Sequence, residues 1–136
     1  MYDMGNSLDE AEFVQGELSE EIIGAAMKVL NTLKPGLNEK AYENALVIEM
    51  RRRGRPIEQQ KRFDVLYEGQ VVDIMIPDLI IGGTVIVDPK VTEEFNRTHV
   101  AQMLGYLAIT GLGLALLISF KHSDLRWKRV ARTQSA

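Results

Sequence analysis

The sequence predicts an α+β sandwich, in which helices flank one central mixed β-sheet. Two observations lead to this class. Apolar residues recur with helical spacing in residues 19–53 and 96–110, whereas apolar and polar residues alternate between residues 57 and 91. The predicted order is helix, helix, mostly antiparallel strands, helix and two more strands, which is typical of one sheet with helices packed on it.

The first helix is expected to follow a loose N-terminal arm. Residues 1–17 are polar and acidic without a regular apolar period, so a single domain is expected over residues 18–136. Ser19 is a good N-cap, and the two glutamates after it suit the positive end of a helix. Lys34-Pro35-Gly36 ends this helix, and a second one is expected from Asn38 to Arg53, before Gly54.

Alternating segments predict paired strands joined by tight turns. The expected pairs are Ile57–Tyr67 with Gln70–Met75 around Glu68-Gly69, and Ile76–Ile81 with Thr84–Val91 around Gly82-Gly83. The remaining elements are a helix from Asn96 to Thr110 and strands at Leu114–Phe120 and Leu125–Ala131.

Composition limits the kind of metal site that the chain can build. The 136 residues fit one domain, and they include two histidines and no cysteine. Any metal would therefore be held mainly by oxygen, which favours Mg²⁺ or Mn²⁺ over zinc. The formal net charge of −3 gives no global attraction for nucleic acid, so basic contacts would be local. We find no membrane-spanning run or secretory leader, and we expect a cytoplasmic protein.

Clustered charges offer two candidate sites. Asp88 and Lys90 are two residues apart on one strand and share a face, and Asp78 lies on the expected partner strand. Two carboxylates can hold Mg²⁺ beside a scissile phosphate, and a lysine can orient water or neutralise charge. Spacing alone nevertheless favours a surface salt bridge. For the arginines of residues 51–55, a solvated helix end is favoured over a phosphate contact.

Five short motifs occur in one order along nearly the whole chain. They are Ile22-Ile23-Gly24-Ala25-Ala26, the Gly36–Tyr42 segment with Gly36, Glu39 and Tyr42, Pro77-Asp78-Leu79, Val85–Lys90, and Ala101–Tyr106 with Gln102 and Tyr106. In this order the chain resembles the bacterial and archaeal GxxExxY family, grouped with the PD-(D/E)XK nuclease superfamily. The resemblance implies a PD-(D/E)XK nuclease-like core.

The resemblance also implies a role for each matching residue. Glu39, Asp78 and Asp88 would hold the metal, and Lys90 would be the catalytic lysine. Asp88 stands where the family usually has glutamate. Glu39 as an ordinary acid at a helix start remains equally plausible.

On the third helix, Gln102 and Tyr106 would flank the site and touch substrate, since they are one turn apart. Gln102 bonded only to neighbouring backbone is the alternative. His99 lies three residues earlier and is more readily explained as a surface residue. Tyr42 is better explained as core packing with a satisfied hydroxyl.

Pro89, between Asp88 and Lys90, departs from a regular central strand because it has no N–H. The strand is expected either to bulge there, which would displace Lys90, or to be unpaired on one side.

The function favoured by these residues is magnesium- or manganese-dependent hydrolysis of phosphodiesters in DNA or RNA, by a site that Pro89 has made degenerate if the strand bulges. The alternative is a non-catalytic module of the same fold that binds nucleic acid or a partner protein. A third hypothesis is a small structural subunit that forms a homodimer.

Overall fold

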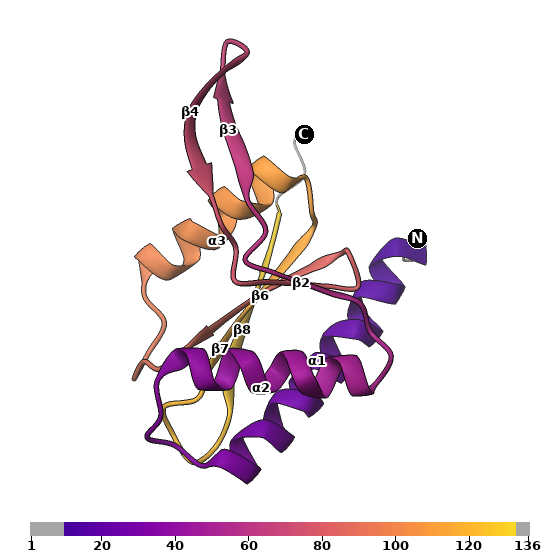
Figure 1. Ribbon diagram of the computed structural model, residues 1–136, viewed down its shortest axis with the longest axis vertical. Helices are drawn as coiled ribbons and strands as arrows, with labels where there is room; N and C mark the ends of the chain where they lie inside the picture. Colours follow the sequence, from indigo (N-terminus) through magenta and orange to yellow (C-terminus); the bar gives the residue numbers. More distant parts are fainter. Residues whose placement is uncertain (1–9, 133–136) are drawn as a thin grey trace, which may run out of the picture.

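The centre of the protein is a five-stranded mixed sheet. Figure 1 shows the computed structural model, which describes residues 10–132. The strands of the sheet lie in the order β2-β5-β6-β7-β8. They are β2 (Ile57–Gln59), β5 (Leu79–Ile81), β6 (Val85–Lys90), β7 (Leu114–Ser119) and β8 (Arg126–Ala131). β6 and β7 are parallel, and the other neighbouring strands are antiparallel. The α+β sandwich with a mixed sheet is thereby confirmed.

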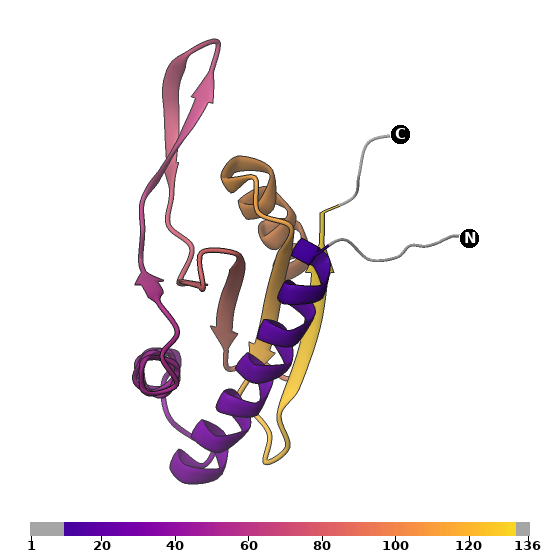
Figure 2. The same cartoon turned by 90° about the vertical axis from the view of Figure 1, so that its right-hand side faces the viewer.

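Helices cover both faces of this sheet. The helices α1 (Glu10–Leu33) and α2 (Glu39–Arg52) pack on one face, and α3 (Arg97–Thr110) packs on the other. Figure 2 shows α2 end-on beside the sheet. Successive strand residues point to opposite faces, so Val85 and Val87 join the core under α1 and α2, whereas Ile86 joins the core under α3. Within residues 10–132, no helix is long and apolar enough to cross a membrane.

The first helix begins earlier than expected. α1 starts at Glu10, so the prediction of a loose arm is wrong for residues 10–17, and residues 1–9 lie outside the described residues. Ser19 is buried inside the helix rather than capping it. Its hydroxyl donates to the Gly16 carbonyl at 2.9 Å and accepts from Arg129 Nη2 at 3.1 Å. A serine can therefore satisfy its hydroxyl within a helix by bonding to the preceding turn.

The expected strand Ile57–Tyr67 is two strands in two different sheets. Gln60 has a φ of 58°, a left-handed conformation that ends β2. The chain then forms β3 (Phe63–Tyr67), which pairs only with β4 (Gln70–Met75). The turn at Glu68-Gly69 between them is confirmed, with φ values of 52° and 77°. We call residues 63–75 the arm, because Figures 1 and 2 show them projecting beyond the rest of the protein.

The turn at Gly82-Gly83 joins β5 and β6 as expected. Ile81 pairs with Val85, and both glycines have positive φ values, 63° and 71°. A side chain at Gly82 would be strained in this conformation, and its Cβ would lie 2.8 Å from Leu18 Cδ2 on α1. The glycine therefore permits both the turn and the close packing of α1 against it.

Candidate metal-dependent nuclease site

Asp78 and Asp88 meet at one end of the β5–β6 pair. Leu79 pairs with Val87, so one further step of the same register places Asp78 opposite Asp88. Asp78 and Asp88 lie two residues from Ile80 and Ile86 of the α3 core, so their side chains belong to the face that α3 covers. The neighbouring Asp78 raises the pKa of the Asp88 carboxyl group, as expected for two acids that lie close together. The predicted approach of these two acids is therefore present in the structure.

Lys90 lies beside the two acids on the same face. Its Nζ is 3.3 Å from Asp88 Oδ2, and the side chains of Lys90 and Asp88 are only 15% and 6% exposed. An ion pair this buried is not the solvated surface salt bridge that spacing alone favoured, and breaking it would leave a charge with little water around it.

Burial and the neighbouring acid control the ionisation of Asp88. Desolvation, followed by the neighbouring Asp78, raises the pKa of Asp88 to about 7 against the lowering effect of Lys90. One ammonium therefore does not neutralise the two carboxylates. A divalent cation held by oxygen ligands would, so the donor set fits Mg²⁺ or Mn²⁺.

Pro89 leaves β6 regular. β6 pairs with β7 from Val85–Leu114 to Lys90–Ser119 without a shift in register, so the bulge considered from the sequence does not occur. The Phe120 N–H donates to the Lys90 carbonyl at 2.9 Å, which places the polar backbone groups of Lys90 on the β7 side. By alternation, the backbone of Pro89 faces the β5 side, where pairing has already ended at Val87. The other alternative from the sequence, a strand that is unpaired on one side at Pro89, is therefore correct.

A second proline explains why the pairing ends there. Continuing the β5–β6 register by two residues from Leu79–Val87 would place Pro89 opposite Pro77. Neither residue has an N–H, so neither could donate to the other across an antiparallel pair. The missing donor of Pro89 therefore leaves no partner strand unsatisfied, and Asp88 and Lys90 keep the common face of a regular strand.

Glu39 reaches the same end of the sheet from the first turn of α2. Its Oε2 accepts a hydrogen bond from the Val91 N–H at 3.1 Å, one residue beyond Lys90. The charges of Glu39 and Lys90 both act on His99, so these three residues are close together. Across residues 10–132, however, no three acidic or histidine side chains are grouped tightly enough to enclose an ion as they stand.

Two residues at this site were missed in the sequence. Glu43 is buried on α2, and its Oε2 accepts from Gln59 Nε2 at 2.7 Å and from Gln60 Nε2 at 3.0 Å. The same amide of Gln60 donates to Asp78 Oδ1 at 3.1 Å. Gln60 thus links Glu43 to Asp78. Glu43 could have been noticed because it follows Glu39 by one helical turn, whereas no pattern marked Gln60.

Gln102 and Tyr106 contact each other on α3. Gln102 Nε2 donates to the Tyr106 hydroxyl at 3.0 Å, rather than to backbone. The pKa of Tyr106 is raised by burial and then by the negative charges of Asp88 and Asp78, which places this hydroxyl near the acids. His99 caps α3, since its Nδ1 accepts from the Asn96 N–H at 3.1 Å.

Tyr42 is a core residue, as favoured from the sequence. Its ring stacks on Phe120 with 4.7 Å between ring centroids, and its hydroxyl donates to the Lys34 carbonyl at 2.6 Å. It supports the loop before Glu39 by also accepting from the Leu37 N–H at 3.1 Å.

Of the arginines at the end of α2, Arg53 pairs with Glu49 and Arg55 pairs with Glu21.

Comparisons with known proteins address the family directly. No curated protein matches the chain. Among solved structures, the crystal structure of an alkaline exonuclease (LHK-Exo) from Laribacter hongkongensis matches with a TM-score of 0.48 and 15% identity, over 84% of this chain and 82% of that one. The family model of the PD-(D/E)XK nuclease superfamily matches residues 16–130, which include every site residue described above. The chain therefore belongs to the PD-(D/E)XK nuclease superfamily.

Proposed function

We propose that this protein is a metal-dependent nuclease that hydrolyses phosphodiester bonds in DNA or RNA. The observation that carries the proposal is the meeting of Asp78, Asp88 and Lys90 on one face of a strand that stays regular through Pro89. A displaced Lys90 was the main reason to expect a degenerate site, and a regular strand removes that reason. The finer assignment to the GxxExxY family, and a cytoplasmic location, are part of the same proposal.

Asp78 and Asp88 would hold Mg²⁺ or Mn²⁺, with Glu39 as a third ligand after exchanging its bond to the Val91 N–H. The bound cation would polarise the scissile phosphate and make bound water more acidic. Lys90 is placed to orient the attacking water or to neutralise negative charge that develops on the phosphate. Gln102 and Tyr106 would contact the nucleic acid from α3, because the charges of Asp88 and Asp78 act on the Tyr106 hydroxyl and Gln102 is hydrogen-bonded to it.

A binding module without catalysis is the second candidate. The observation that favours it is the engagement of Glu39 with backbone, which leaves the acids of residues 10–132 without a closed three-ligand group. In that case the site would bind a cation or nucleic acid without cutting.

The test is a cleavage assay on labelled single- and double-stranded DNA and RNA, with Mg²⁺, Mn²⁺ or EDTA. The wild type is expected to cut at least one substrate only with metal, and Asp78→Asn and Lys90→Ala are expected to abolish cutting. Asp124→Asn is the matched control, because Asp124 is an exposed acid between β7 and β8. Metal-dependent binding of nucleic acid without cutting of any substrate would overturn the nuclease proposal in favour of the binding module.

A further inference from the structure

The arm exposes an unusual amount of apolar surface. Five of its large side chains are between 40% and 69% exposed: Leu66, Tyr67, Val71, Val72 and Ile74. The two-stranded arm contacts α3 near its base and projects away from the five-stranded sheet (Figure 2). An isolated two-stranded hairpin is marginally stable in water, and a contiguous exposed apolar patch usually marks an interaction surface.

The charge of the arm indicates what kind of surface covers it. The arm contains three acids, Asp64, Glu68 and Asp73, and no basic residue. These acids alone equal the formal net charge of −3 of the whole chain. Nucleic acid is a polyanion and would be repelled. The arm therefore suits a protein surface that is apolar and carries positive charge at its rim.

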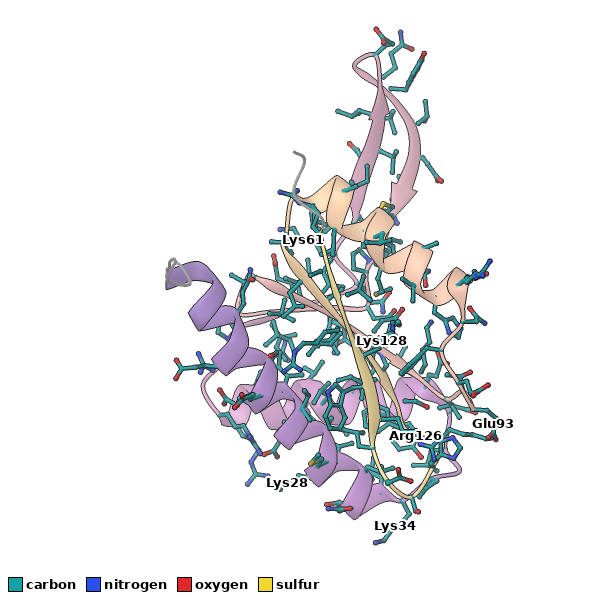
Figure 3. The ribbon with its side chains drawn as sticks, turned by 180° about the vertical axis from the view of Figure 1, so that it is seen from behind. Lys28, Lys34, Lys61, Glu93, Arg126 and Lys128 are labelled. Atoms are coloured by element: carbon teal, nitrogen blue, oxygen red, sulfur yellow. The ribbon has the colours of Figure 1, made fainter. Side chains whose placement is uncertain are left out.

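The protein itself presents such a surface between the start of α3 and β8. A cavity of about 660 Å³ there is lined by the apolar Phe95, Val100, Ala101 and Leu104 and by the polar or basic Asn96, Arg97 and Lys128. No acid lines it. Neither basic residue forms an ion pair with the side chains that the structure describes. Figure 3 shows Lys128 on β8 in the view from behind. We call this cavity the α3–β8 groove.

We propose that the arm of one copy lies in the α3–β8 groove of a second copy, and the reverse, in a two-fold homodimer. Apolar side chains of the arm would fill the groove, while its acids would face Arg97 and Lys128. Figures 1 and 2 show the tip of the arm pointing away from the domain that carries it, so its own groove is out of reach. A two-fold arrangement forms both contacts at once and closes the assembly.

The test uses charge reversal on either side of the contact. Glu68→Lys with Asp73→Lys makes the arm basic, and Arg97→Glu with Lys128→Glu makes the groove acidic. Each double variant opposes like charges in its own dimer, so its dimer dissociation constant should rise at least about tenfold. A mixture of the two should form a heterodimer, because both of its contacts again join opposite charges.

Molecular mass is measured by light scattering and sedimentation over a range of concentrations, with circular dichroism to verify folding. All four positions are exposed, so the variants should fold. Glu20→Lys with Lys121→Glu is the matched control and should dimerise like the wild type. A monomeric wild type at every concentration, a dimer that neither reversal weakens, or a mixture that stays monomeric would each overturn the proposal.

Discussion

Asp88 keeps a proton at a pH where a free aspartate has lost it, because it is buried and lies beside Asp78. Its pKa is raised from 3.8 to about 7, so over this range the folded protein binds a proton that the unfolded chain does not. The free energy of unfolding of the metal-free protein should therefore fall as the pH rises through this range. Above about pH 7 the loss is complete.

Asp88→Asn removes this dependence, since asparagine does not ionise. Relative to wild type, the variant should gain up to about 4 kcal/mol in unfolding free energy between about pH 4 and pH 7. Urea unfolding in EDTA at several pH values measures the difference, with Asp124→Asn as the exposed control. Parallel pH profiles for wild type and Asp88→Asn would contradict a raised pKa at this carboxyl.

Gln60 positions Asp78 through a single amide that also bonds to the buried Glu43. Gln60→Ala should lower metal-dependent activity about 10–100-fold, the usual effect of removing a partner that orients a metal ligand. Titration of the metal should show weaker binding as well. Gln59→Ala is the matched control, because Gln59 bonds to Glu43 and Asn44 but not to Asp78. Equal losses in both variants would assign Gln60 a purely structural role.

At the scale of the element, β6 supports the site by being regular, and Pro89 takes part in that regularity. Pro89→Leu should leave cleavage unchanged, since the added N–H would face the end of β5 without an acceptor strand. Unfolding should become easier by about 1–4 kcal/mol, because proline restricts the unfolded chain (about 0.4–1 kcal/mol) and a buried N–H without an acceptor costs about 1–3 kcal/mol. Cleavage rates and urea unfolding check both expectations. A marked increase in activity would mean that the proline does distort the catalytic face.

Two features that the sequence failed to predict, the early start of α1 and the break after β2, have separate physical causes. α1 extends to Glu10 although residues 10–17 lack a clear apolar period, because a continuing helix needs only backbone bonding and one packed face. The break after β2 depends on the left-handed conformation of Gln60, which is rare outside glycine, asparagine and aspartate. By contrast, the glycines of Glu68-Gly69 and Gly82-Gly83 predict turns directly, because positive φ values favour glycine.

For the whole molecule, local sequence patterns predicted the order of helices and strands and the sandwich. They also predicted the meeting of Asp78, Asp88 and Lys90. The roles of Glu43 and Gln60 could not be predicted, because they depend on α2 lying beside the end of β2. Neither segment carries a sequence pattern that indicates this tertiary contact. The effect of Pro89 also required the fold. Only the register shows that it stands where pairing has ended, opposite another proline.

The parallel pairing of β6 with β7 has a consequence for the synthesis of the protein. β6 is buried along nearly its whole length. Its parallel partner β7 lies 29 residues further along the chain, as the pairing of Val85 with Leu114 shows. At a translation rate of about 5–20 residues per second, this apolar strand waits about 1.5–6 s for its neighbour. During that interval its open edge can pair with other chains. The strand that carries Asp88 and Lys90 therefore has one unpaired edge until β7 has been synthesised.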